Sequence, residues 1–514
     1  MKSIIDHIPS TEFGVEQIGD QSYKFKCVLF NKDNQHLVLR RGALETLVLN
    51  DDILKFYHYG YIDIKNPHNF LYRTDLIKDV RGEDFVNCFK LRNDPNLFIY
   101  LFLEPAIKGS LATDELNNET SSMEFIFAVT KPYLIPHPTG NPDLLTMRME
   151  FEDHRQVELR TQLSDYSTKT LYDELTKDET NLPASEKNEV YTGEAVKDLL
   201  TKSLGPASKF SGMFDRGSFK TTYTSPGNKT YAYDLERLLG QHVSVEEKHQ
   251  CPCLLKANRF VLDQEFSLTP LYDIYNHAYN HNTKTSGIYM TERFVLSEQD
   301  VSSDARSDLT GGRELFAPND IGSYHFPDHS IISNYTFNDV QNITNATRYK
   351  PREAHNYDSN NKTFHISYIP QKTFDDEYLN NVSGPVVGSN QPTYNTHDYT
   401  NLNRTIEHYT TNDQSKAAAH SKNSKLYETI FNGNQLEFTA RGGPWRRAMR
   451  FCSVETAGQG PGSSFNSKVC GQYLILNVKH EFNSSGYTNT VKATTPNNLD
   501  ELGQSTGLDG YRAV

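Results

Sequence analysis

The chain has 514 residues, of which only 36% are hydrophobic, and it carries a formal net charge of −13. This length suggests three or four domains rather than one large core. The excess of acids over bases argues against nucleic-acid wrapping or adhesion to an anionic membrane as the main function, because both need a positive surface. The longest apolar run, Leu97 to Leu103, is far shorter than the roughly 20 residues of a spanning helix, so no membrane insertion is expected.

The ends and the cysteines of the chain indicate a cytoplasmic site of synthesis. The first residues, MKSIIDHIPS, contain an acid and a Pro where a signal peptide has an unbroken apolar stretch. Six Cys residues are too few and too irregularly spaced for a disulfide framework. The nearest approach to a metal signature, His249-x-Cys251-Pro252-Cys253, has no second ligand pair at zinc spacing. Buried thiols are therefore favoured over a metal site.

Residues 1–160 are predicted to form an antiparallel β domain. Apolar residues alternate from Tyr23 to Phe30, and further short runs are rich in Phe, Tyr, Val and Leu, which suit a pleated, half-buried surface. Turn-forming Asn, Asp, Gly and Pro separate these runs. The other strands are expected at 37–39, 47–49, 53–59, 97–103, 123–130 and 144–151.

Residues 161–300 are predicted to be a mixed α and β domain with two amphipathic helices. The first has Thr192 as its cap and ends at Gly205-Pro206, and its apolar residues recur at helical spacing. The second is expected to open at Thr269-Pro270, a cap followed by Pro at the first helical position. Short strands are expected near Leu254-Leu255 and from Tyr289 to Leu296.

The last third of the chain changes composition twice. Residues 301–424 contain a stretch rich in Asn and Tyr and poor in Leu, which is predicted to be an ordered, β-poor insertion. Residues 425–496 return to strand patterns, with strands at 436–440 and 448–454 and a hairpin from Gln472 to Thr494 around Asn483-Ser484-Ser485-Gly486. Residues 497–514 form a polar tail. The predicted fold class is therefore α+β, predominantly β.

None of the standard catalytic or phosphate-binding motifs occurs in the sequence. Glu150, Glu152, Asp153 and His154 form an acidic cluster that suits a divalent ion, but the solvated end of a strand is the favoured interpretation. Carboxylate pairs for glycoside hydrolysis exist among the 65 acids, and nothing singles out one pair. No catalytic residue, cofactor or metal is predicted.

One basic patch stands out against the acidic background. It surrounds Gly442-Gly443-Pro444 and contains no acid. Such a patch suits electrostatic docking of a partner or contact with passing DNA, although pairing with acids elsewhere in the fold is the commoner role. Its only Trp is a plausible interface anchor, because Trp and Arg are enriched at binding hot spots. The candidate docking residues are Arg441, Trp445, Arg446, Arg447 and Arg450.

The order of these elements resembles a known family. A β domain precedes the helix beginning Gly193-Glu194-Ala195 and the segment 267–275, and a strand pair closes the pattern, with His480 on one strand and Tyr487-Thr488-Asn489-Thr490 on its return. This order resembles the central baseplate hub protein of contractile-tailed bacteriophages, which is related to the N-terminal part of type VI secretion spike proteins. The resemblance covers roughly residues 1–300 and 425–495, and the segment from about 301 to 425 departs from it.

The resemblance implies a structural virion protein without catalytic residues. It implies a homotrimer in which each chain supplies two tube-like β domains, 1–160 and 425–496. Three chains then form a pseudo-sixfold ring that joins the sixfold tail tube to the threefold central spike and the baseplate wedge proteins, with a channel through which DNA passes. The implied location is the tail baseplate of the virion, after assembly in the host cytoplasm.

Two other functions remain open from the sequence. One is a tail-associated glycan-degrading enzyme with its site in residues 301–424. The other is a different tail or baseplate adaptor with the same β-rich composition. No repeat between the two β domains is visible in the sequence.

Overall fold

The computed structural model describes the β-rich ends and the helical middle of the chain, and it supports the predicted α+β, predominantly β class. The residues described are 15–18, 21–31, 36–39, 43–65, 97–105, 123–136, 139, 146–176, 189–206, 208–210, 214–246, 249–251, 253–257, 265–270, 291–296, 331–338, 352–358, 362–369, 405–409, 434–444, 446–449, 451–456, 471–483 and 486–495. The predicted tail at 497–514 lies outside them.

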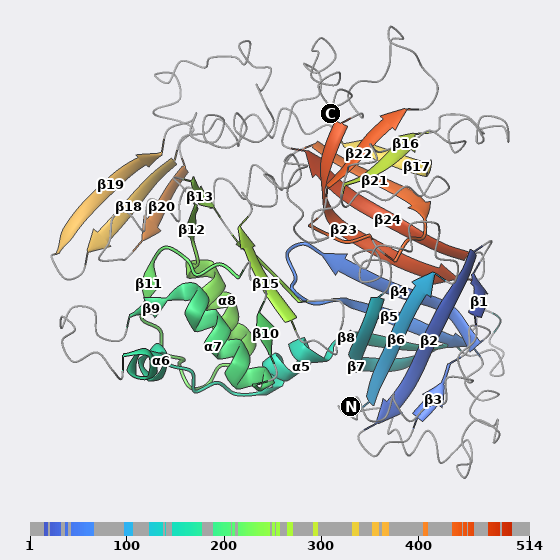
Figure 1. The fold of residues 1–514 in the computed structure, drawn as a ribbon, viewed down its shortest axis with the longest axis horizontal. Helices are drawn as coiled ribbons and strands as arrows, with labels where there is room; N and C mark the ends of the chain where they lie inside the picture. Colours follow the sequence, from blue (N-terminus) through green and yellow to red (C-terminus); the bar gives the residue numbers. More distant parts are fainter. Residues whose placement is uncertain are drawn as a thin grey trace, which may run out of the picture.

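The first β domain is a curled antiparallel sheet (Figure 1, blue to teal). Its strands lie in the order β1-β2-β6-β7-β8-β5-β4, and β3 also pairs with β2. The bounds are β1 Val15–Ile18, β2 Gln21–Asn31, β3 His36–Val38, β4 Leu44–Asp52, β5 Tyr59–Lys65, β6 Leu97–Pro105, β7 Met123–Ile135 and β8 Thr146–Asp153.

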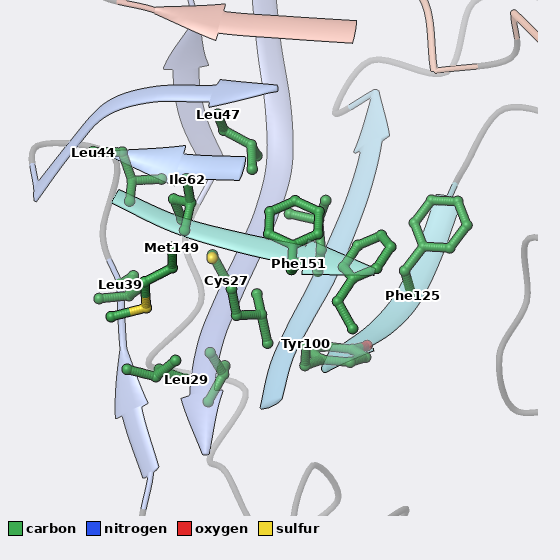
Figure 2. Close-up of a cluster of buried hydrophobic side chains, with 14 of the residues drawn as sticks. Cys27, Leu29, Leu39, Leu44, Leu47, Ile62, Tyr100, Phe125, Met149 and Phe151 are labelled. Carbon is green, nitrogen blue, oxygen red and sulfur yellow. The ribbon is translucent and has the colours of Figure 1, made fainter. Parts of the chain in front are cut away.

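Alternation of side chains produces the core of this sheet. In β8 every second residue is buried, so Met147, Met149 and Phe151 point inward while their neighbours face outward. Figure 2 shows Met149 and Phe151 among the buried side chains of the cluster, with Cys27 from β2 and Phe125 from β7. Burial of such apolar surface is the main stabilising term of the domain.

The second β domain is a closed barrel (Figure 1, red and yellow-green). Its strands follow the circular order β16-β22-β23-β24-β21-β17, and two parallel pairs between β17 and β16 close the circle. The bounds are β16 Thr291–Leu296, β17 Ile331–Asn338, β21 Asn434–Arg441, β22 Phe451–Thr456, β23 Gly471–Asn483 and β24 Gly486–Thr495. The predicted hairpin around 483–486 is confirmed as β23 and β24.

The two β domains repeat one topology. In the first domain β6-β7-β8-β5-β4 are successive antiparallel neighbours, and in the second β22-β23-β24-β21-β17 are too, so strands with the same rank in the chain take the same place. The sixth strands differ, because β2 runs antiparallel to β6 whereas β16 runs parallel to β22.

Two β-bulges fall at the same places in both copies. The hairpin β7–β8 has an irregularity between Val129 and Lys131, and β23–β24 has one between Ile475 and Asn477. A second pair lies between Leu44 and Thr46 in β4 and between Ile332 and Asn334 in β17. Bulges are specific local features of a ladder, so their coincidence marks an internal duplication. Ala128 of β7 thus corresponds to Leu474 of β23, since both close the ladder with the preceding strand.

Direct strand pairing joins the two domains. The end of β4 pairs antiparallel with β23, from Leu47 opposite Phe482 to Asp52 opposite Asn477. The edge of the first sheet is therefore continuous with the wall of the second barrel.

The middle domain packs helices and short strands around its own apolar cluster (Figure 1, green). Its elements are α5 His154–Thr161, α6 Thr168–Leu175, β9 Val190–Tyr191, α7 Thr192–Leu204, β10 Lys209–Phe210, β11 Lys220–Thr221, α8 Tyr231–Gln241, β12 Ser244–Glu246, β13 His249–Cys251, β14 Cys253–Ala257 and β15 Glu265–Pro270. A further sheet contains β18 Arg352–Asp358, β19 Thr363–Ile369 and β20 Thr405–Tyr409.

Several predicted elements need correction. The predicted strand at 53–59 is a turn between β4 and β5, and the predicted helix start at Thr269-Pro270 is the end of β15, paired with β14; residues 271–278 lie outside the description. Thr192 begins α7 but does not cap it, because its hydroxyl contacts His242 instead. In the region predicted to be β-poor, the described residues include four strands, β17 to β20.

Candidate functional site

The junction of the three domains is built around one buried carboxylate. Asp51, at the end of β4, is 3% exposed, and its Oδ1 accepts a hydrogen bond from Lys256 Nζ at 3.1 Å. Its Oδ2 accepts one from the amide of Ala448 at 3.0 Å. Lys256 belongs to the middle domain and Ala448 to the segment before β22, so one side chain connects all three domains.

Lys256 completes this junction by donating to main-chain oxygens. Its Nζ lies 2.8 Å from the carbonyl oxygen of Lys55 and also contacts that of Asp52. A buried ammonium needs such partners because desolvation of an unpaired charge is costly. The turn between β4 and β5 is thereby held against the middle domain, where Phe56 also packs on Phe266 with ring centroids 6.4 Å apart.

The predicted docking segment begins at a second buried polar cluster. Asn489 of β24 accepts hydrogen bonds at its Oδ1 from the Gly443 amide at 2.6 Å and from Arg446 Nη1 at 2.8 Å. These donors fix the orientation of the Asn489 amide, so its Nδ2 donates to His480 Nδ1 at 2.9 Å. The hydroxyl oxygen of Tyr487 lies 2.7 Å from the same nitrogen. The cluster holds Gly443 and Arg446 on the barrel.

The structure separates the five predicted docking residues. Arg446 is 1% exposed, and its guanidinium donates a hydrogen bond to Asn489. This side chain therefore supports the segment from inside the fold and does not offer a docking surface. Arg447 is half-buried. The side chains of Arg441, Trp445 and Arg450 lie outside the described part, and a docking role for them stays a prediction.

The segment's close fit to Tyr487 leads to a testable prediction. A Cβ added to Gly442 would lie 2.1 Å from Cγ of the Tyr487 ring, and that ring stacks on Phe482 at 4.0 Å. We expect Gly442→Ala to lower the free energy of unfolding by about 1–3 kcal/mol, the range for overpacked sites. Gly240→Ala is the control, because its Cβ would meet open space and Ala favours the helix. Urea denaturation should show opposite signs, and equal effects would contradict the packing argument.

Asp215, His242 and Cys253 meet in the middle domain, with ligand-type atoms within 4.8 Å of one another. Their chain spacing gives no sign of this, since the metal-like motif in the sequence includes only Cys253. Asp215 Oδ2 lies 2.7 Å from His242 Nε2, while tetrahedral zinc keeps such atoms about 3.3 Å apart. Asp215 and His242 are therefore hydrogen-bonded directly to each other, and this short distance does not fit two ligands of one zinc ion.

Further hydrogen bonds satisfy the other polar atoms of Asp215 and His242. Asp215 accepts from Ser244 Oγ at 2.8 Å and from the Gly217 amide at 2.7 Å, and Thr192 Oγ1 lies 2.9 Å from His242 Nδ1. Burial raises the pKa of Asp215, but the bonds and charge of His242 outweigh it and lower that pKa overall. These hydrogen bonds connect the start of α7 to the end of α8.

The acidic cluster at the end of β8 was predicted to be a solvated strand end, and this prediction is wrong. Asp153 is fully buried and caps α5, while His154 lies against Ile126 with Nδ1 at 3.1 Å from its carbonyl oxygen. Glu150 and Glu152 lie on the opposite face of β8, so the four residues do not converge on one ion. Of the thiols predicted to be buried, Cys27 and Cys452 are buried and Cys253 is half-buried.

No helix within the described ranges is long and apolar enough to span a bilayer.

Comparisons with known proteins find structural neighbours among solved structures, at low sequence identity. No family model matches the sequence, and no curated protein does. Among solved structures, the tail protein of Neisseria meningitidis MC58 is 8% identical, with 93% of this chain and 98% of that chain covered and a TM-score of 0.47. The 43 kDa tail protein of prophage MuSo2 from Shewanella oneidensis is 9% identical, with 92% and 99% covered and a TM-score of 0.43.

A third structural neighbour is a chain of a two-protein complex. The Francisella PdpA-VgrG complex, in its lidded form, has a chain that is 10% identical, with 93% of this chain and 53% of that chain covered and a TM-score of 0.41. The three neighbours are thus two tail proteins and a chain of a PdpA-VgrG complex.

Proposed function

We propose that this chain is a non-enzymatic baseplate hub protein of a contractile tail, which acts as a homotrimer between the sixfold tail tube and the threefold central spike. The observation that carries the proposal is the internal duplication. Two β domains share five strands in one order and two bulges at equivalent positions.

Duplication inside one chain gives a physical solution to a symmetry mismatch. A ring of three identical chains has threefold symmetry, but two similar domains per chain present six similar faces. One surface of such a ring matches a sixfold tube, while the ring as a whole matches a threefold spike. A chain with a single β domain would need six copies to present the same six faces to the tube.

The other parts of the proposal concern partners and the channel. We expect the ring to contact the tail tube protein, the central spike protein and the baseplate wedge proteins, and to enclose a channel for DNA during ejection. The net charge of −13 suits a channel wall that repels phosphates and so does not retain DNA. Arg441, Trp445, Arg447 and Arg450 remain candidates for contacts with one of these partners.

Native mass measurement tests this function. We expect the purified chain, alone or together with its spike protein, to give a species of three 58.6 kDa subunits. Binding of one spike trimer per ring should follow. A monomer in both measurements would contradict the hub function.

A further inference from the structure

The contact between the two β domains leaves a complementary edge on each. Within the chain, the edge of β4 in the first domain pairs with the outer half of β23 in the second. The duplication means that β7 has the counterpart of the β23 edge, and β17 has the counterpart of the β4 edge. The first of these counterparts lies in the first β domain and the second lies in the second β domain.

Both counterpart edges lack a strand partner among the described residues. Past Ala128, β7 pairs only with β8, so the stretch Lys131–Ile135 has one open side. Past Ile332, β17 pairs only with β21, so Tyr335–Asn338 has one open side too. Open strand edges are templates for pairing with another chain.

Exposure differs between the covered and the open copies. His480 of β23 is fully buried where it pairs with Leu49, whereas Leu134, its counterpart in β7, is 49% exposed. Val48 of β4 is 1% exposed, whereas Thr336, its counterpart in β17, is exposed. The positions that the contact within the chain covers are thus the ones left uncovered at the two open edges.

We propose that the open edge of β7 pairs antiparallel with β17 of a second copy of this chain, in the register of the contact between β4 and β23. The inference rests on the proposed trimer and names its contact. Tyr133 then lies opposite the partner's Asn338, Leu134 opposite the partner's Phe337, and Ile135 opposite the partner's Thr336. Each chain uses one edge of each kind, so the contact is head-to-tail, and with the threefold rotation of the proposed trimer between copies it closes into a ring.

Pro132 limits the hydrogen bonding of this contact. Pro132 has no amide hydrogen, and Pro in a sheet is confined to edges and bulges. The ladder between chains is therefore poorer in hydrogen bonds than the one within the chain, where Val478 holds this position. Tyr133, Leu134 and Ile135 supply apolar area in compensation. Such an edge also resists indiscriminate pairing, because only a partner that covers these side chains gains from it.

Cysteine cross-linking tests the register. The Cα atoms of directly opposed residues on antiparallel strands lie about 5.5 Å apart or less, and a disulfide can bridge that distance. Tyr133→Cys combined with Asn338→Cys should give covalent dimers and trimers under mild oxidation, as multiples of 58.6 kDa on a non-reducing gel. The pair Tyr133→Cys with Phe337→Cys is the control, since adjacent strand residues point to opposite faces. It should give no such ladder, and neither should the single variants.

A charge placed on the edge tests the contact without cross-linking. Leu134→Asp should abolish the trimer peak in mass measurement, because an unpaired carboxylate in the contact would be desolvated. Leu175→Asp is the matched control, at a Leu that is 56% exposed on α6, and it should leave the trimer intact. Circular dichroism should show both variants folded, since both side chains face solvent in the single chain.

The outcomes separate this inference from the proposed function. A trimer that forms with Leu134→Asp, or one that gives no cross-link at the predicted pair, overturns the contact and leaves the hub function standing. A wild-type chain that remains monomeric with its spike overturns both.

Discussion

Asp51→Ala is expected to lower the free energy of unfolding by about 3–5 kcal/mol, the cost of breaking a buried ion pair on one side. The substitution leaves the Lys256 ammonium, in a side chain 13% exposed, without its carboxylate. It also removes the acceptor of the Ala448 amide, and an unsatisfied buried donor costs about 1–3 kcal/mol. Since Asp51 connects three domains, its loss should also reduce the cooperativity of unfolding between them.

A surface pair and a double variant make this test specific. Asp198 pairs with Lys202 one helical turn away on α7 at 2.8 Å, with the two side chains 14% and 34% exposed, and Asp198→Ala should cost about 0–1 kcal/mol. Asp51→Ala combined with Lys256→Met removes both charges and should recover a large part of the loss. Urea denaturation of the variants measures these differences. If Asp51→Ala costs no more than Asp198→Ala, the junction is not held by its charges.

Strand patterns alone located most of the β structure correctly. The alternation from Tyr23 to Phe30 became β2, and the hairpin around Asn483 and Gly486 became β23 and β24. These segments obey local rules, because period-two alternation and a tight turn fix both the burial and the pairing partner. The fold class followed from them.

Errors arose where tertiary packing, rather than local pattern, decides the structure. Residues 53–59 have the apolar content of a strand, but they form a turn. In this turn Phe56 packs on Phe266 and His58 packs on Phe125. Three helices were missed for a related reason. The helix α5 is highly charged, and it forms because Asp153 caps it and Arg155 packs inside. In α8, the spacing of Ala232, Leu235 and Leu238 was a helical signal that the sequence did contain.

The duplication was invisible in the sequence because it conserves register, not residues. Gly60 of β5 corresponds to Leu436 of β21, and Met149 of β8 corresponds to Val491 of β24. Each pair shares only its place in the ladder. The same limit applies to the basic patch, where charge suggested exposure for Arg446 but the acceptor that buries it, Asn489, is 43 residues away.

The second large effect is expected at Asp153→Ala. Asp153 is fully buried, and Arg155 binds it through Nε at 2.9 Å and Nη2 at 2.5 Å. Burial alone raises the pKa of this carboxyl, but the charge and hydrogen bonds of Arg155 outweigh it and bring the pKa down from 3.8 to about 2. Removing the carboxylate leaves a buried guanidinium and an uncapped helix, which together should cost about 3–5 kcal/mol.

The depressed pKa also fixes how the stability of the wild-type protein should depend on pH. A carboxyl whose pKa is lower in the folded state stabilises that state above its unfolded pKa, and this stabilisation is lost as the pH falls. For Asp153 the loss should begin as the pH falls toward 3.8 and be largely complete by the folded-state pKa of about 2, with a total of about 2 kcal/mol. In Asp153→Ala combined with Arg155→Met, that part of the acid dependence should disappear, because no carboxylate remains to be protonated. A denaturation series from pH 6 to pH 2 in which both proteins lose stability equally would show that other groups carry the acid response.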